Sequence, residues 1–377
     1  MSLSRRSLIK YGTYTYLSMA TSQSLIASLW PEKGVRKQMK LNPVKIAILG
    51  LGNYAEKWIA PAIHQSKFAK VNSIITGSPD KIGRWKKAFS IKDENIYNYE
   101  NLDQIANNPD IDCVYIASPT GTHKAFTIRS LAANKHVICE KPMAPTVTDC
   151  DEMIIAAEKV NKTLQIGYRL YWDPFNVRLM NAMKNNEFGT FKDLKGGFSY
   201  NHGNLTYNGD WRVNPKMNPG GALFDIGVYV AQSAFYGTQM QPLRVTAQNS
   251  TQRTSIFKEI PEHWNWQLEW PNGAKSEHSA SYGKSENFLH INTPKGKIGI
   301  EPAYSYQGLA GYTPENKMNF HHVFQQKNQI DGQCKAILKR EANITSGKMG
   351  RRDIYLLNAI MEAAETQNTI KLGNFYI

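Results

Sequence analysis

The chain has 377 residues, which is enough for two domains with full hydrophobic cores. Its 41% hydrophobic and 20% charged residues exclude an intrinsically disordered protein. The net charge of +14 is dispersed and forms no basic stripe interleaved with aromatic residues, so we expect no nucleic-acid partner. The four cysteines lack metal-ligand spacing, and we expect buried free thiols and no metal site.

The first thirty residues predict an export signal. Ser4–Lys10 contains a twin-arginine pair, and the weakly apolar stretch that follows it to about Trp30 is too polar to span a membrane. A disordered basic tail is the alternative that stays open. We expect residues 1–30 to direct the protein to the periplasm by the twin-arginine route, residues 31–42 to form a connector, and no membrane association after export.

A glycine-rich turn after the first apolar run predicts a dinucleotide-binding fold. The run Lys45–Leu49 is typical of a strand buried on both faces of a parallel sheet, and it leads into the pattern G-x-G-x-x-A. The first glycine permits the turn, the second lets a pyrophosphate approach the backbone, and the small last residue lets the next helix pack closely. That helix presents its N-terminal N–H groups to the phosphates. A turn without a ligand is the alternative, which the flanking strand and helix patterns disfavour. The expected nucleotide contacts are Gly50, Gly52, Asn53, Tyr54 and Ala55.

The end of the second predicted strand, Lys70–Thr76, favours NADP over NAD. An NAD-binding chain usually has Asp or Glu there, which binds the ribose hydroxyls. Here small donors are followed by Lys81 and Arg84, which suit a 2′-phosphate. Asp80 as an acidic ribose ligand stays open, although it also fits the cap of the next helix, Lys81–Phe89. The expected contacts of the NADP phosphate are Thr76, Gly77, Ser78 and Lys81.

Strands and helices alternate up to residue 168, which predicts an α/β nucleotide-binding domain over residues 43–168 with a doubly wound parallel sheet. Loops at the carboxyl edge of such a sheet face the cofactor, and we expect His123 to position one of these loops. The predicted strands are Ile96–Tyr97, Asp112–Ala117, His136–Cys139 and Leu164–Tyr168, and the predicted helices are His123–Ala133 and Thr146–Val160. The expected cofactor contacts of the loop are Ser118, Pro119, Thr120 and His123.

The second half, residues 169–377, predicts an α/β substrate and oligomerisation domain built on a sheet. Its strand signals are alternating or β-branched residues bounded by turns, and its last two segments have helical patterns, the final one able to pack back on the first domain. The predicted strands are Asp193–Tyr200, Leu243–Ser250, Asn265–Trp270, Ala274–Tyr282 and Phe288–Ile291, and the predicted helices are His321–Lys339 and Gly350–Glu365.

A series of motifs, in this order and spacing, resembles the family of glucose-fructose oxidoreductase, inositol dehydrogenase and rhizopine catabolism proteins, abbreviated Gfo/Idh/MocA. The motifs are GLGNYA, ITGSPDK, DCVYIASP, KHVICEKPMA, IGYRLYWDPFN, DWR at Asp210–Arg212 and PGGALFDIGVY at Pro219–Tyr229. The resemblance covers nearly all of Val44–Ile377 and is greatest to the glucose-fructose oxidoreductase branch. It implies a Rossmann domain followed by a domain with a large, open, mostly antiparallel sheet, through which subunits pack into dimers or tetramers.

The resemblance also implies a sugar substrate and three catalytic residues. Lys141 follows a predicted strand at the edge where the nicotinamide lies, Asp225 binds the hydroxyl that is oxidised, and Tyr229 is the general acid and base. Many relatives have histidine at the last position. A phenol with a pKa near ~10 is a poor base unless a cation such as Lys141 stabilises the phenolate. The spacing of four predicts that Asp225 and Tyr229 share a helix face.

Each of these residues has a structural alternative that the sequence leaves open: a solvated lysine in a turn, or a tyrosine that only packs in its helix. The remaining expected cofactor contacts are Glu140, Lys141, Arg169, Trp211 and Arg212. The expected sugar contacts are Lys141, Tyr171, Asp173, Arg212, Asp225 and Tyr229.

The expected reaction converts an aldose to a lactone and then reduces a ketose or another carbonyl on the retained cofactor. Three alternatives remain. The connector is shorter than the arm of the glucose-fructose oxidoreductase branch, which leaves open an ordinary dehydrogenase or reductase with exchangeable cofactor. An exported NAD-assisted glycosidase of the same superfamily would have an acidic residue where Gly77 stands. A non-catalytic binding module would not need Lys141, Asp225 and Tyr229.

Overall fold

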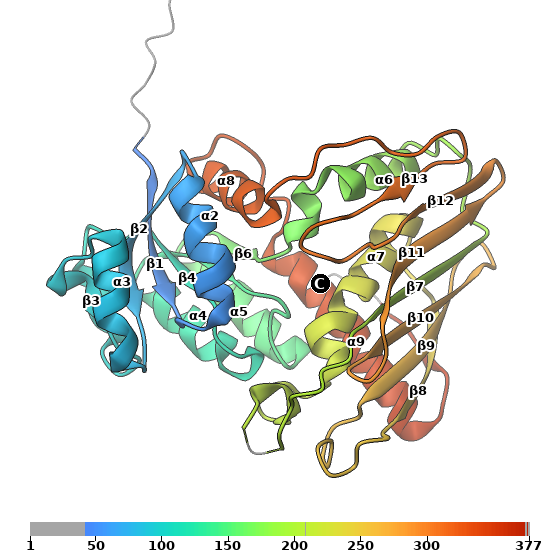
Figure 1. Cartoon of the computed structure of the whole chain (residues 1–377), viewed down its shortest axis with the longest axis horizontal. Helices are drawn as coiled ribbons and strands as arrows, with labels where there is room; N and C mark the ends of the chain where they lie inside the picture. The colour runs from blue at the N-terminus through green and yellow to red at the C-terminus, as the bar shows by residue number, and fades with distance from the viewer. Residues whose placement is uncertain (1–41, 208, 374, 376–377) are drawn as a thin grey trace, which may run out of the picture. The chain divides into compact units, whose positions relative to one another are not determined.

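The computed structural model describes residues 42–207, 209–373 and 375 (Figure 1). The predicted export signal and all of the connector except Asn42 lie outside the described residues. From Pro43 onward the chain forms one compact unit. None of the described helices combines the length and the apolar character needed to cross a bilayer.

The first sheet has six parallel strands in the order β3-β2-β1-β4-β5-β6. This order confirms the predicted doubly wound sheet, and it places the carboxyl ends of β1, β4 and β5 next to one another. Central strands of such a sheet are covered on both faces, which explains their uninterrupted apolar sequences. The strands are β1 (Val44–Leu49), β2 (Ala69–Ile75), β3 (Ile96–Tyr97), β4 (Cys113–Ile116), β5 (His136–Cys139) and β6 (Leu164–Ile166).

The helix after the glycine-rich turn differs from the prediction in its first turn. It begins as a π-helical turn, Ala55–Ile59, and continues as the α-helix α2 (Ala60–Gln65). The other helices around this sheet follow their local signals. At the start of α5, the Thr146 side chain accepts a hydrogen bond from the Asp149 N–H at 3.1 Å. These helices are α3 (Ile82–Phe89), α4 (His123–Ala132) and α5 (Val147–Lys159).

The second sheet has eight strands in the order β13-β12-β11-β7-β10-β9-β8-β14, and only the pair β7 and β10 is parallel. This confirms the expected large, mostly antiparallel sheet. The sequence analysis missed β12, β13 and β14, of which the last two have only two residues each. The strands are β7 (Asp193–Ser199), β8 (Arg244–Ser250), β9 (His263–Glu269), β10 (Lys275–Ser281), β11 (Glu286–Thr293), β12 (Gly296–Ile300), β13 (Gly311–Tyr312) and β14 (Ile370–Lys371).

Helices cover one face of this second sheet (Figure 1). The most central is α7 (Val228–Thr238), whose residues are buried on every side. A further helix, α6 (Pro174–Lys184), has no counterpart among the predicted elements. The sheet surface away from α7 has ion pairs at its exposed positions, such as Lys195 with Glu277 at 2.7 Å.

The last two helices pack on the elements of the first sheet. Helix α8 (Gln325–Ile337) begins later than predicted and lies against α2, where Ser66 donates a hydrogen bond to Asp331 at 2.6 Å. Helix α9 (Gly347–Thr366) lies against α5, and its Asn358 donates a hydrogen bond to the Pro145 carbonyl at 3.1 Å. The C-terminal helices therefore link the two sheets.

Candidate functional site

A cavity of about 420 Å³ lies at the carboxyl edge of the parallel sheet. Loops that follow β1, β4 and β5 form one side of it, and residues of the second half of the chain form the other. The lining residues are Gly50, Leu51, Gly52, Asn53, Tyr54, Ser78, Lys81, Tyr99, Ala117, Ser118, Pro119, Thr120, Glu140, Lys141, Trp211, Arg212, Asp225 and Tyr306.

The glycine-rich turn has the backbone shape that a pyrophosphate site requires. Gly50 has a φ of +88°, and a Cβ there would lie 2.8 Å from the Ala117 carbonyl oxygen, so no other residue fits. No described atom lies within 4 Å of a Cβ built on Gly52, which leaves its backbone open to a ligand. Ala55 is buried behind the turn and lies outside the described lining, as a residue that packs helix on strand should.

The loop after β2 contributes Ser78 and Lys81 to the cavity, whereas Thr76 and Gly77 lie outside its described lining. The Lys81 ammonium donates a hydrogen bond to the Leu51 carbonyl at 2.9 Å, which holds a cation against the glycine-rich turn. Gly77 has a packing role, because a Cβ there would lie 2.8 Å from the Tyr99 ring.

Arg84 does not join this group. Its guanidinium pairs with Glu56 at 2.8 Å on the surface. The phosphate contact that the sequence suggested for Arg84 therefore has no support in the structure, and Lys81 is the basic residue of this loop that lines the cavity.

His123 connects two loops at the edge of the sheet. Its ring nitrogens lie 2.8 Å from the Ser118 carbonyl oxygen and 2.9 Å from the Pro142 carbonyl oxygen. Burial lowers the pKa of the His123 ring. The ring is outside the described lining of the cavity, which agrees with a positioning role and not with direct contact.

The same loop is joined to a segment of the second half of the chain. The Gly121 N–H donates a hydrogen bond to the Met217 carbonyl at 3.0 Å. A Cβ on Gly121 would lie only 2.0 Å from the Lys216 carbonyl oxygen, so the two main chains touch here because this residue has no side chain.

Lys141 and Asp225 meet at the edge of the cavity. The Lys141 ammonium donates to the Asp225 main-chain carbonyl at 2.6 Å and lies 3.4 Å from the Asp225 carboxylate. Their side chains are 13% and 11% exposed, so both are nearly buried yet still reach the cavity. Asp225 belongs to a π-helical turn, Leu223–Gly227, directly before α7. Such wide turns occur frequently at functional sites.

Donors from three separate segments surround the Asp225 carboxylate. Tyr282 donates a hydrogen bond at 2.8 Å, the Arg212 guanidinium one at 3.2 Å and Tyr200 one at 3.5 Å, all to the same oxygen. Burial would raise the pKa of Asp225, but the charges of Lys141 and Arg212 and the bond from Tyr282 outweigh burial and lower it. Asp225 is therefore a charged carboxylate at neutral pH.

Tyr229 lies beside this pair in a shell of cations and aromatic rings. The Lys141 ammonium is 5.0 Å from its ring centroid, and the Arg169 guanidinium is 4.8 Å from it and donates a hydrogen bond to its hydroxyl at 3.2 Å. Tyr229 is buried and lies outside the described lining, whereas Tyr306, 4.5 Å beneath the same guanidinium, lines the cavity.

Three predicted ligand contacts are engaged elsewhere. Arg169 is buried and also donates hydrogen bonds to the Gln325 side chain and to the main-chain carbonyls of Tyr304 and Ser305. Asp173 is the N-cap of α6, and Tyr171 packs edge-on against Tyr236. All three lie outside the described lining, as Tyr229 does, so the contacts of Arg169 with the cofactor and of Asp173 and Tyr171 with the sugar stay predictions.

Glu140 is the second carboxylate of the cavity, and it has different neighbours. The buried Tyr115 hydroxyl donates a hydrogen bond to it, and Gln329 donates to Tyr115 at 3.2 Å. Burial raises the pKa of Glu140, and the nearby hydrogen bonds and charges only partly offset this rise. A Cβ on Gly167 would lie 2.6 Å from the Glu140 carboxylate, so this glycine leaves room for it.

Several site residues were missed by the sequence analysis. Tyr99 and Tyr306 line the cavity, and Tyr200 and Tyr282 hold Asp225. Each of the four lies in a loop or just past a strand end, where a lone tyrosine carries no local pattern. The predicted pair Trp211 and Arg212 does line the cavity, with the guanidinium 4.7 Å from the indole ring centroid.

Two family models match this chain. "Oxidoreductase family, NAD-binding Rossmann fold" matches residues 44–168, and "GFO/IDH/MocA C-terminal domain" matches residues 177–298. Among solved structures, the aldose-aldose oxidoreductase of Caulobacter crescentus, complexed with glycerol, is 33% identical with a TM-score of 0.83, over 88% of this chain and 100% of that one.

Two further proteins are similar at lower identity. The D-xylose 1-dehydrogenase [NADP(+)] of Haloarcula marismortui is 24% identical over 341 residues, which are 88% of this chain and 94% of that protein. Levoglucosan dehydrogenase, in complex with NADH and levoglucosan, has a TM-score of 0.75 at 17% identity over 88% of this chain and 100% of that one, which shows a shared fold. Together with the glycine-rich turn, the two sheets and the cavity between them, these matches show that the chain belongs to the Gfo/Idh/MocA family of NAD(P)-binding oxidoreductases.

Proposed function

We propose that the protein is an exported, NADP-dependent sugar oxidoreductase, which oxidises the anomeric hydroxyl of an aldose to a lactone and then reduces a second sugar carbonyl on the same bound cofactor. The observation that carries the proposal is the meeting of Lys141 and Asp225, with Tyr229 beside them, in a cavity that also contains the glycine-rich turn. The likeness to an aldose-aldose oxidoreductase and to an NADP-dependent xylose dehydrogenase supports it.

The residues present fit a dinucleotide. The open backbone at Gly52 and the ammonium of Lys81 suit its phosphates, and the Tyr99 ring offers an aromatic surface near the loop after β2. The acidic residue typical of NAD sites is absent from the end of β2, where Thr76 and Gly77 stand, so we propose NADP. When bound, the nicotinamide accepts a hydride from the sugar and returns it.

Asp225 and Lys141 hold the sugar in this proposal. The charged Asp225 carboxylate accepts a hydrogen bond from a sugar hydroxyl, and the three donors around it fix its orientation. The Lys141 ammonium offsets its negative charge and can donate to the same hydroxyl oxygen. Because both side chains are nearly buried, water competes weakly for these bonds.

Tyr229 moves the proton. In its phenolate form it takes the proton of the sugar hydroxyl in the oxidation and becomes a neutral phenol, and this phenol gives the proton back to the new alkoxide in the reduction. The negative charge that the phenolic oxygen carries before the oxidation, and regains in the reduction, is stabilised by the Arg169 guanidinium, which donates a hydrogen bond to it, and by the Lys141 ammonium beside the ring. Arg169 is therefore a positioning residue for the proton transfer.

Assembly and location complete the proposal. We propose that the open face of the second sheet joins subunits into a homodimer or homotetramer, as the family resemblance implies, because the described helices cover only the other face of this broad sheet (Figure 1). Export to the periplasm rests on the twin-arginine pattern in residues outside the structure described. Light scattering of the purified protein and fractionation of cells that express it test these two points.

The nucleotide that accompanies the purified protein tests the main proposal. The full chain is purified without added nucleotide and denatured, and the released compounds are identified. We expect about one NADP per chain, and we expect the native protein to convert a mixture of an aldose and a ketose without added cofactor. A protein that is empty but oxidises sugars with added NADP is an exchanging dehydrogenase. A protein that binds no nicotinamide nucleotide at all contradicts the proposal.

A further inference from the structure

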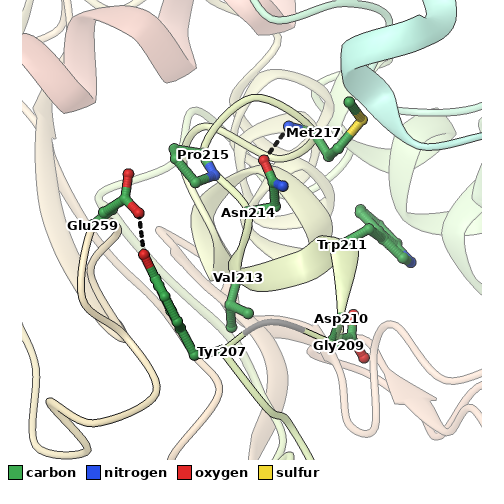
Figure 2. A pocket seen from close by; sticks show the side chains of 9 residues that line it. All are labelled: Tyr207, Gly209, Asp210, Trp211, Val213, Asn214, Pro215, Met217 and Glu259. Carbon is green, nitrogen blue, oxygen red and sulfur yellow. Dashed lines mark hydrogen bonds between the residues drawn. The ribbon is translucent and has the colours of Figure 1, made fainter.

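A second cavity, of about 310 Å³, lies next to the catalytic one, and Figure 2 shows the side chains that line it. Trp211 lines both cavities, so a single indole ring belongs to the wall of each. In Figure 2, Tyr207 lies to the left and Trp211 to the right, with Asn214 and Pro215 drawn above Tyr207 and Val213. The lining residues are Tyr207, Gly209, Asp210, Trp211, Val213, Asn214, Pro215, Met217 and Glu259.

The composition of this lining selects one class of ligand. It combines two aromatic rings, two carboxylates and an amide, and among the described lining residues there is no lysine or arginine. The cation paired with these carboxylates, Arg212 on Asp210, is outside the described lining, so the cavity offers no positive charge to a phosphate and does not suit a part of the nucleotide. Aromatic faces beside hydrogen-bond acceptors suit a neutral ring with many hydroxyl groups. The volume is near the lower limit for small-molecule sites, which fits one sugar unit.

Contacts between distant segments hold the far side of the cavity in place. The Tyr207 hydroxyl donates a hydrogen bond to Glu259, 52 positions further along the chain. The Lys258 ammonium lies 4.3 Å from the centroid of the Tyr207 ring and is outside the described lining. The Asn214 side chain accepts a hydrogen bond from the Met217 N–H at 3.3 Å. These bonds organise the polar groups before a ligand arrives.

The near side of the cavity is coupled to the catalytic carboxylate. The Asp210 carboxylate accepts hydrogen bonds from the Arg212 N–H at 3.0 Å and from its guanidinium at 3.2 Å. The same guanidinium donates to Asp225 at 3.2 Å. One arginine therefore lies between the carboxylate of the second cavity and the carboxylate that we propose to hold the reacting hydroxyl.

We propose that the second cavity is a subsite for the sugar unit that adjoins the one being oxidised, so that the preferred substrate is a reducing oligosaccharide and not a free monosaccharide. This inference rests on the proposed function. Trp211 stands where the two units are joined, and Tyr207 and Glu259 contact only the second unit.

The test compares substrates of different length. The kcat/KM of the full-length holoprotein is measured with three monosaccharides, glucose, xylose and galactose, and with two reducing disaccharides, cellobiose and maltose. We expect at least one disaccharide to exceed the best monosaccharide. The ratio of the kcat/KM for that disaccharide to the kcat/KM for the best monosaccharide is the disaccharide advantage. In Tyr207→Ala and Glu259→Gln this advantage should fall by about tenfold, the size expected when one stacking or hydrogen-bonding group is lost. The kcat/KM for the monosaccharide should stay within about twofold of wild type, because neither residue lines the catalytic cavity.

Two further variants control for indirect effects. Tyr207→Phe keeps the ring and should lose less of the advantage than Tyr207→Ala. Glu365→Gln, an exposed position on α9, should change neither substrate. If monosaccharides react and the disaccharides have no advantage, or if the advantage survives in Tyr207→Ala and Glu259→Gln, the subsite is refuted while the proposed function stands. If none of the five sugars reacts, the proposed function fails and the subsite fails with it.

Discussion

Two carboxylates line the same cavity, and their pKa values are shifted in opposite directions. Glu140 and Asp225 are almost equally buried, at 6% and 8% exposure. Burial raises the pKa of Glu140, whose closest partner is the neutral hydroxyl of Tyr115. Burial has the same tendency at Asp225, but its two cations and its tyrosine donor lower the pKa instead. The number and charge of the partners, and not the depth of burial, decide in which direction each pKa is shifted.

The direction of one side chain contributes to this difference. Lys141 follows Glu140 in the sequence, yet its ammonium bonds with Asp225, which is 84 positions away. The cavity therefore has a firmly charged acid on the side proposed for the sugar, and an acid with a weaker tendency to ionise on the side of the glycine-rich turn. A less charged acid there repels the phosphates of a dinucleotide less.

The largest expected effect comes from removing the shared cation. In Lys141→Met, sugar oxidation should fall by about 10³-fold or more, because Asp225 loses one of its two counter-charges and the phenolate form of Tyr229 loses a neighbouring cation. Steady-state kinetics of the holoprotein measure the fall. Lys141→Arg keeps the positive charge but not the compact ammonium, so its rate of sugar oxidation should lie between those of wild type and Lys141→Met. A rate near that of wild type in Lys141→Met would remove this residue from the mechanism.

Tyr229→Phe tests the proton transfer while leaving both carboxylates in place. We expect kcat to fall by about 10²–10³-fold, the usual contribution of a general acid or base, with little change in KM. The variant should release as much nucleotide on denaturation as wild type, because Tyr229 lies outside the described lining of the cavity. If kcat is unchanged, the tyrosine only packs in its helix.

Tyr282→Phe should reduce the difference between the pKa values of Asp225 and Glu140, with a smaller effect on the rate than the two preceding variants. It removes the 2.8 Å hydrogen bond that helps to lower the pKa of Asp225, so that pKa should rise. The acidic limb of the pH–rate profile should move to higher pH by up to about one unit. Tyr200→Phe is the matched control, because its bond to the same oxygen is 3.5 Å long and its shift should be smaller. Equal shifts, or none, would contradict this assignment.

The smallest effect is on the pH dependence of stability. The folded-state pKa of Asp225 is below the unfolded value of about 3.9. Its ionisation therefore stabilises the folded protein above that pH, and this stabilisation is lost as the pH falls through the folded-state pKa. The folded-state pKa of Glu140 is above the unfolded value of about 4.3. Its protonated form therefore stabilises the folded protein at lower pH, and this stabilisation is lost as the pH rises through the folded-state pKa.

Thermal unfolding between pH 3 and pH 7 separates the two acids. Relative to wild type, Glu140→Gln should become more stable as the pH rises, and Asp225→Asn should become less stable as the pH rises, by about 1.4 kcal/mol for each pKa unit of the original shift. Slopes of the same sign in the two variants would show that burial alone governs both groups.

The first half of the chain could be predicted from sequence because its signals are local. Each central strand is a short apolar run, and the glycine-rich turn follows the first of them directly. The side chain of Thr146 caps its helix as the pattern suggests. The second half depends on pairing between distant segments, and short strands such as β13 and β14 gain their partners only in the folded chain.

Site residues that belong to a sequence motif could be predicted. Site residues that reach the cavity only through the pairing of distant segments could not. Lys141 and Asp225 come together as the family motifs imply. Asp173 belongs to a motif as well, but its carboxylate accepts hydrogen bonds from the Phe175 and Asn176 N–H groups and so begins a helix that the sequence analysis did not predict. Tyr282 reaches Asp225 through the register of the second sheet, which no local pattern in the sequence specifies.

The contact at Gly121 has a consequence for how the two cavities are joined. Its N–H donates a hydrogen bond to the main chain of Met217, which lines the second cavity, and the neighbouring Thr120 lines the catalytic cavity. The two backbones are in direct contact here, with no side chain between them, so the walls of the two cavities share one fixed point. A methyl group at position 121 would meet the Lys216 carbonyl oxygen at 2.0 Å and force the two main chains apart, so this one substitution would disturb a wall of both cavities without altering any reacting atom.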